Sequence, residues 1–273
     1  MVTWFGVGEV RCAMLNVGQF EMNAKVLFAN AEEESLQVAL DRHALPIEPI
    51  VFQINPLFID TGTDRVLVDP GGLGPSDSLP SSLREMGIGP ETIDTIVVTH
   101  GHSDHFWGCV GADGARAFPS ARIAIQRAEW EHWLADGNPE PHHAQTFREV
   151  LLPLRDRVDL LCGDTEIVPG VEAISTPGHS PGHMAVVVAG RAVQTGDAIL
   201  NEIYVEHPDW CASFELWPDE VVATRRSLLH FIAERDLLMV QPHFPHPGLG
   251  RLVPWEDAWT WVPEDTGAAP SPA

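Results

Sequence analysis

Residues 99–105 read Thr-His-Gly-His-Ser-Asp-His, so one short stretch of this 273-residue chain holds three histidines and an aspartate. It directly follows residues 92–98, an apolar, β-branched run that is typical of a buried strand. Side chains two positions apart lie on the same side of an extended chain, so His100 and His102 can converge on one point beyond the strand end. Imidazole nitrogens and carboxylate oxygens are preferred ligands of zinc and similar ions. The stretch therefore predicts a metal site where a strand ends.

The rest of the chain supplies further ligand candidates. Asp104 and His105 lie farther along, where the chain turns toward a helix, and can serve a second point near the first. His179, Asp197 and His243 also follow apolar segments, which is the arrangement that places a site at one edge of a sheet. A carboxylate has two oxygens and can bridge two ions. We therefore assign the candidates as follows: His100, His102 and His179 to one metal, Asp104, His105 and His243 to the other, and Asp197 to both.

Strand and helix patterns alternate along the chain, which favours sheets with helices packed on their outer faces. The predicted strands are 51–60, 65–71, 92–98, 121–126 and 170–176, with two more strands within 183–197. The predicted helices are 78–87, 128–136, 143–157 and 219–236. Residues 1–263 are expected to form one domain, followed by a flexible, Pro-rich C-terminal tail at 264–273.

Composition excludes several classes of partner. The formal net charge is -23 and Lys25 is the only lysine, which argues against nucleic acid or an anionic membrane. No run of about 18 apolar residues exists that could span a membrane, and the N-terminus lacks the pattern of a signal peptide. The four cysteines are far apart and form no C-x-x-C pair, so free thiols and a cytoplasmic location are expected.

The order of these motifs resembles that of the metallo-β-lactamase fold superfamily. H-x-H-x-D-H, a later TPGH, then GD and a distal histidine follow one another over roughly residues 50–246. The resemblance implies an αββα sandwich, in which helices flank two mixed β-sheets, with a dinuclear metal centre. It also implies hydrolysis by a metal-bridging hydroxide, with Asp104 or Asp197 accepting or relaying the proton. Zinc is the expected metal, and a mixed N/O site also accepts Mn, Co or Fe.

Three segments resemble the branch that contains methyl parathion hydrolase and the quorum-quenching lactonases: 57–75, 90–105 and 241–252. This branch implies an ester, lactone or phosphotriester as substrate. In acyl-homoserine lactonases a tyrosine three residues after the bridging aspartate helps to polarise the substrate carbonyl. Here that position is Leu200, and the only tyrosine, Tyr204, stands seven residues after Asp197. Acyl-homoserine lactonase activity therefore stays an alternative, as does a metal-dependent binding or sensing module without turnover.

The expected partner is a small, apolar substrate, and a homodimer is left open. Candidate pocket residues are Phe106, Trp107, Leu200 and Tyr204, although Phe106 and Trp107 can equally anchor a helix in the core.

Four other polar residues have a structural interpretation beside or instead of a functional one. Asp69 either orients a metal ligand or belongs to a turn before Pro70. His183 either lines the site or packs under the PGH turn. His142 and His143 begin a predicted helix and are expected to face solvent.

The seven candidate ligands predict a metal content close to two divalent ions per chain, since each shell can fill. Elemental analysis of the purified protein, before and after reconstitution with zinc, measures this number. A content of one or none after reconstitution would contradict a dinuclear centre.

Overall fold

Two seven-stranded β-sheets lie face to face in the computed structural model, which describes residues 1–264. The first sheet contains β1 (Val2–Val7), β2 (Val10–Leu15), β5 (Leu57–Asp60), β6 (Arg65–Val68), β7 (Thr95–Val97), β8 (Arg122–Gln126) and β9 (Val158–Leu161), side by side in that order. The second contains β10 (Thr165–Val168), β11 (Val171–Ser175), β12 (Met184–Val188), β13 (Ala192–Gln194), β14 (Leu238–Val240), β15 (Leu249–Trp255) and β16 (Ala258–Pro263), likewise in order. Strands β6 to β9 run parallel, as do β13 and β14, and the other neighbours are antiparallel, so both sheets are mixed.

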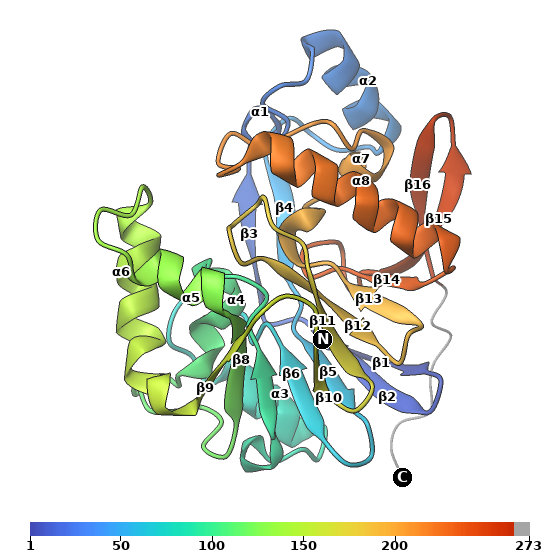
Figure 1. Cartoon of the computed structure of the whole chain (residues 1–273). Helices are drawn as coiled ribbons and strands as arrows, with labels where there is room; N and C mark the ends of the chain where they lie inside the picture. The colour runs from blue at the N-terminus through green and yellow to red at the C-terminus, as the bar shows by residue number, and fades with distance from the viewer. Residues whose placement is uncertain (265–273) are drawn as a thin grey trace.

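Helices cover the outer face of each sheet. The first sheet is covered by α3 (Ser78–Glu85), α5 (Arg127–Leu134) and α6 (Pro141–Val150), and Figure 1 shows α5 and α6 beside β8 and β9. The second is covered by α7 (Ile203–Glu206) and α8 (Pro218–Glu234). Short helical turns complete the chain: α4 (Ser103–Phe106), η1 (Pro90–Thr92), η2 (Trp107–Cys109), η3 (Leu152–Arg157) and η4 (Gly196–Ala198). The predicted αββα sandwich is confirmed.

The apolar residues form three layers of core, as the alternation of side chains along a strand requires. In β6, Val66 and Val68 face the other sheet, whereas Leu67 between them faces the outer helices. The layer between the sheets therefore consists of strand residues from both sheets, and each outer layer joins one sheet to its helices.

Two predicted elements differ from those observed, and a proline explains each difference. The predicted strand 51–60 divides into β4 (Ile50–Ile54) and β5, because Pro56 has no amide hydrogen to donate to a ladder. The predicted helix 143–157 ends as α6 at Val150 and continues as the 3₁₀ turn η3, which contains Pro153.

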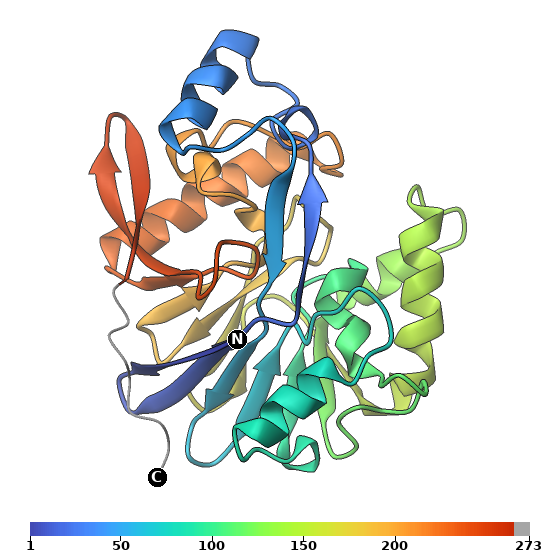
Figure 2. The ribbon, with the colours of Figure 1, turned by 180° about the vertical axis from the view of Figure 1, so that it is seen from behind.

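Strand β4 pairs with β3 (Gly18–Met22) as a separate two-stranded ribbon. Together with α1 (Ala24–Leu27) and α2 (Glu33–Arg42) it forms a cap that extends beyond one edge of the sandwich, seen at the top of Figure 1 and from behind in Figure 2. The cap is attached to α7 through His43, whose Nε2 lies 3.0 Å from Glu206 Oε2 and whose Nδ1 lies 3.3 Å from Glu202 Oε1.

Within residues 1–264, no helix combines the length and the apolar character that crossing a membrane would need. The predicted tail, residues 264–273, lies outside the described residues except for Glu264.

The contacts of His43 predict a pH-dependent attachment of the cap. The hydrogen bond to Glu202, followed by that to Glu206, raises the pKa of His43 above its ordinary 6.5, although burial opposes the shift. Stabilisation by a group with a raised folded-state pKa is fully present below the unfolded-state pKa and is lost as pH rises through the folded-state pKa. We therefore expect His43→Gln to lower the free energy of unfolding at about pH 6, and this difference from the wild type to shrink toward about pH 9.

Urea unfolding across this pH range measures the effect, with His230→Gln as the control because His230 is exposed on α8. A His43→Gln difference that grows with pH would contradict the assignment.

Candidate metal centre

Five strands end at the edge of the sandwich where the cap is attached. Strands β6 and β7 are parallel and belong to the first sheet, and β13 and β14 are parallel and belong to the second. Strand β11 runs in the same direction as β13, since each is antiparallel to β12 between them. The polar residues that follow these strands are therefore collected at one place, and the structure brings all seven candidate ligands together there.

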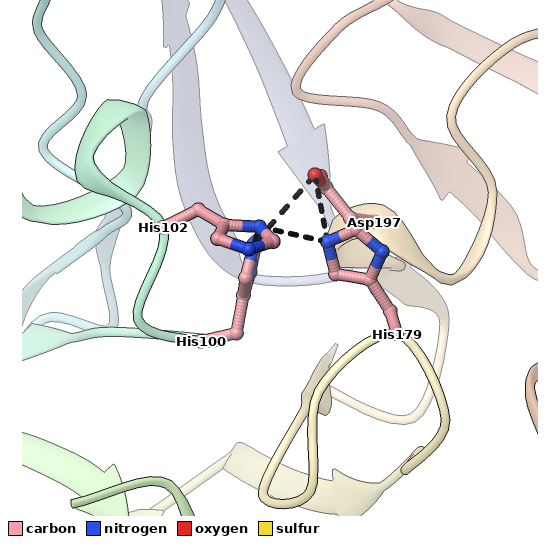
Figure 3. Close-up of side chains that lie close together, drawn as sticks. All are labelled: His100, His102, His179 and Asp197. Atoms are coloured by element: carbon pink, nitrogen blue, oxygen red, sulfur yellow. Dashed lines mark hydrogen bonds and ion pairs between the residues drawn. The ribbon is translucent and has the colours of Figure 1, made fainter. Parts of the chain in front are cut away.

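The first group consists of His100, His102, His179 and Asp197, whose ring nitrogens and carboxylate converge on one point (Figure 3). Nδ1 of His102 lies 2.9 Å from Nε2 of His179 and 3.0 Å from Nε2 of His100. Oδ2 of Asp197 lies 3.5 Å from Nε2 of His179 and 3.6 Å from Nε2 of His100. The four residues are buried.

The second group consists of Asp104, His105 and His243. The Nε2 atoms of His105 and His243 are 3.2 Å apart, and Oδ2 of Asp104 lies 3.5 Å from each of them. Oδ1 of Asp197 lies 3.3 Å from Nε2 of His105 and 3.1 Å from Nε2 of His243. Asp197 therefore presents one oxygen to each group.

These donors fit divalent cations. Ligand atoms at the corners of a tetrahedral zinc site lie about 3.4 Å apart, close to the spacing within each group. Oδ1 of Asp197 is buried without a hydrogen-bond donor among residues 1–264. A buried carboxylate oxygen that faces only imidazole nitrogens is best satisfied by a cation.

Partners on the outer side of three histidines fix the direction of their rings. Nδ1 of His105 lies 2.9 Å from Oδ2 of Asp69, and Nδ1 of His243 lies 2.8 Å from the carbonyl oxygen of Gln53. Each contact leaves Nε2 of the same ring directed at the centre, the arrangement that orients histidine ligands in metalloproteins. Of the two interpretations of Asp69, the structure favours the orienting one.

The partner of His179 is Glu215, which pattern analysis did not identify. Nδ1 of His179 lies 2.8 Å from Oε2 of Glu215, and the Glu215 side chain is fully buried. Arg225 of α8 lies 3.5 Å from Oε1 of Glu215 and donates to the carbonyl oxygen of Ala198 at 2.7 Å. Glu215 falls in the aromatic segment 210–219, where nothing local distinguishes it from a surface glutamate.

His183 lies behind Asp197. Its Nε2 accepts the amide hydrogen of Asp197 at 2.9 Å, and its Nδ1 lies 3.0 Å from the carbonyl oxygen of Thr176. Burial lowers the pKa of His183 to about 3, which keeps the ring neutral and able to accept this hydrogen bond. Of its two interpretations, packing under the turn is the observed one.

The electrostatics of the centre favour the cation-binding form at Asp197 and His100. Burial would raise the pKa of Asp197, but the surrounding imidazoles, His105 foremost, hold it well below its ordinary value. Burial, with the neighbouring His105, holds the pKa of His100 well below its ordinary value. At neutral pH Asp197 is thus an ionised carboxylate and His100 a neutral imidazole, the states required of ligands. At His105, His179 and His243 burial lowers the pKa, but the neighbouring carboxylates raise it above its ordinary value, so a cation would displace protons from these rings.

A cleft of about 260 Å³ opens above the two groups. Its lining is apolar apart from the candidate ligands and two polar residues at one side: Phe20, Met22, Phe52, His102, Asp104, Glu140, His143, Asp197, Leu200 and Phe214. The ribbon β3–β4 supplies the first three of these residues. Leu200 lies where the sequence places it, at the pocket wall.

Three other predicted pocket residues do not line this cleft. Phe106 is fully buried in the core between α4 and α6, with its ring centroid 5.6 Å from that of Phe147. Trp107 packs against the same core, and the hydroxyl of Tyr204 donates to the carbonyl oxygen of Leu27 in the cap. The helical turns α4, η2 and α7, which carry Phe106, Trp107 and Tyr204, thus place these aromatic rings outside the cleft.

The expectation for His143 is also wrong. Its ring centroid lies 4.8 Å from that of His102, and His143 is half-buried at the cleft, whereas the neighbouring His142 is exposed as expected. Helix α6 starts at Pro141 and places only one of the two adjacent histidines on the inner side.

The family model described as the metallo-beta-lactamase superfamily matches residues 49–248, and the chain belongs to this superfamily. Among curated proteins, an N-acyl homoserine lactonase of Bacillus thuringiensis is 30% identical over 160 residues, which cover 54% of this chain and 58% of that protein. The chain thus matches less than two thirds of that lactonase.

Two solved structures resemble the whole fold. One is described as the hydrolase AbOPH, with TM-score 0.86, 22% identity and coverage of 96% of this chain and 97% of that chain. The other is AidC, described as a dizinc quorum-quenching lactonase, with TM-score 0.87, 23% identity and coverage of 97% of both chains. At these identities the likeness concerns the fold alone.

The position of Asp197 between the two groups predicts that Asp197→Ala weakens metal binding at both, because one oxygen faces each group. We expect the affinity for both ions to fall by at least about 100-fold. Chelator competition with stepwise analysis measures both affinities.

His246→Ala is the matched control. His246 follows the same strand as His243, but its Nε2 lies 2.9 Å from Oγ1 of Thr3, away from the centre. This variant should retain both ions, and the opposite ranking of the two variants would refute the assignment of the bridge.

Proposed function

We propose that this chain is a dinuclear metal-dependent hydrolase that cleaves an ester, lactone or phosphotriester bond in a small, apolar substrate. The observation that carries this proposal is the pair of donor groups that share Asp197 at the floor of an apolar cleft. Imidazole-rich sites suit zinc, and mixed nitrogen and oxygen donors also accept Mn, Co or Fe.

When bound, two divalent cations lower the pKa of a water molecule toward neutrality and polarise the oxygen of an electrophilic substrate. In this proposal His100, His102 and His179 hold one cation. Asp104, His105 and His243 hold the other, and Asp197 contacts both. Asp104 also borders the cleft, so its carboxylate is within reach of the substrate as an acceptor for a proton.

The walls of the cleft support an uncharged substrate. Phe20, Phe52 and Phe214 present aromatic rings to it, and none of its lining residues is a lysine or arginine. Such walls bind an acyl or aryl group and exclude water from the floor, which strengthens electrostatic interactions there.

Because position 200 is a leucine, this cleft lacks a phenolic hydrogen-bond donor at that position. No tyrosine borders the cleft, and the Tyr204 hydroxyl is directed to a backbone carbonyl elsewhere. Without such a donor, only the cations would polarise the electrophile. A substrate with a leaving group that is stable as an anion would then react more readily. This favours aryl esters and aryl phosphotriesters.

Acyl-homoserine lactone hydrolysis is the second candidate. Its support is the 30% identity to the Bacillus thuringiensis lactonase, together with an apolar cleft suited to an acyl chain.

A generic assay separates a hydrolase from a binding module that uses the same centre. A hydrolase should turn over nitrophenyl acetate, lose this activity to a chelator and recover it with zinc. Saturable metal binding without turnover of any ester, lactone or phosphotriester would instead indicate a binding module.

We expect kcat/KM on the zinc-loaded protein to be higher for aryl esters and aryl phosphotriesters than for acyl-homoserine lactones of any chain length. Loss of one polarising donor costs about 10²–10³ in rate at comparable sites, and a good leaving group offsets this loss. A side-by-side kinetic panel measures the ranking. Lactone turnover that exceeds both aryl classes by about tenfold would refute it and favour the second candidate.

Leu200→Tyr is the companion variant. It changes the wall and none of the candidate ligands, so the metal content should stay as in the wild type.

A further inference from the structure

Glu129, the third residue of α5, is a fully buried carboxylate that takes no part in the proposed metal groups. Its Oε1 accepts the amide hydrogen of Gly101 at 2.7 Å and the indole hydrogen of Trp133 at 2.5 Å. Its Oε2 accepts the hydroxyl hydrogen of Ser180 and the amide hydrogen of Gly182, both at 2.8 Å. All four partners are hydrogen-bond donors, so both oxygens of Glu129 act only as acceptors.

These donors belong to two separate loops. Gly101 lies between His100 and His102 in the loop after β7, and Ser180 directly follows His179 in the loop after β11. The two loops come from different sheets, and one carboxylate bonds both of them. Glu129 therefore joins the backbone segments that carry all three histidines of the first group.

A glycine in each of the two loops allows α5 to pack closely against that loop. A Cβ atom at Gly101 would lie 2.1 Å from Nε1 of Trp133, and one at Gly182 would lie 2.3 Å from the backbone nitrogen of Glu129. Real Cβ atoms do not come so close to other atoms. The glycines in HGH and SPGH thus leave the space in which α5 contacts both loops, through Trp133 at Gly101 and through Glu129 at Gly182.

We propose that Glu129 is a positioning residue for the first metal group, and that it sets the separation of the loop of His100 and His102 from the loop of His179. It acts through backbone and hydroxyl hydrogen bonds rather than by contact with the imidazoles. The second group takes no part in these bonds: Asp104 and His105 lie in α4, His243 follows β14, and none of the four donors to Glu129 belongs to these segments. The effect should therefore be confined to one of the two ions.

The inference rests on the proposed dinuclear centre, and Glu129→Gln tests it. Glutamine keeps the size of the side chain but replaces one acceptor oxygen with an NH₂ group, which is a donor. At one of the two loops this donor then faces the N–H or O–H donor of the loop, and the hydrogen bond is lost. We expect the affinity for one ion to fall about 10–100-fold, with the other unchanged, as for other groups that hold ligands in place. Chelator competition gives the two affinities, and the visible absorption of the cobalt-loaded protein reports the geometry of the altered site.

Glu131→Gln is the matched control, because Glu131 lies on the same helix with 66% of its side chain exposed. It should leave both affinities and the cobalt spectrum unchanged. If Glu129→Gln does not fold, Ser180→Ala replaces it, since it removes one donor only and should weaken the same single ion by a smaller factor.

Wild-type affinities for both ions in Glu129→Gln, or an equal loss of both, would overturn the proposal. Failure of the dinuclear centre gives a different result: the wild type itself would bind fewer than two ions. In that case the substitution must weaken the remaining ion if the first group binds it, and must leave it unchanged if the second group does; the reverse would overturn the proposal.

Discussion

The Asp197 carboxylate presents one oxygen to each of two groups of imidazoles, and this sharing constrains much of the fold. A single side chain reaches both groups only if the segments that carry them end at the same edge of the sandwich. The parallel pairs β6–β7 and β13–β14 provide this arrangement, one pair in each sheet. The face-to-face packing of two mixed sheets is thus what brings residues 100 and 243 within reach of one carboxylate.

A buried set of ring nitrogens has a definite orientation only when the outer nitrogen of each ring is also bonded. Asp69, Glu215 and the carbonyl of Gln53 bond three of these rings, and His183 bonds the backbone of Asp197 itself. These partners come from both sheets, from the ribbon and from the segment before α8. The geometry of the centre is therefore a property of the whole sandwich and not of the short motif alone.

The sequence predicts the parts of this arrangement that depend on local pattern. The motif at 99–105 and the apolar runs before His179 and Asp197 are local, so the convergence of the candidate ligands at one edge follows from them, whereas the αββα sandwich is implied by the resemblance to the superfamily. The partners do not follow, because Glu129 and Glu215 look like ordinary glutamates until the chain is folded. Phe106, a candidate pocket residue, is instead buried in the core, because an aromatic ring beside a motif can equally pack there.

The ribbon β3–β4 has two different structural roles. Its side chains, Phe20 and Phe52 among them, form a wall of the cleft, while the main-chain oxygen of Gln53 holds His243. A main-chain oxygen is present whatever residue occupies position 53. Substitutions along the ribbon can therefore reshape the space above the metal groups and leave the support of His243 in place. Proteins with this fold can therefore evolve a different substrate range by substitutions in the ribbon while the candidate metal ligands stay the same.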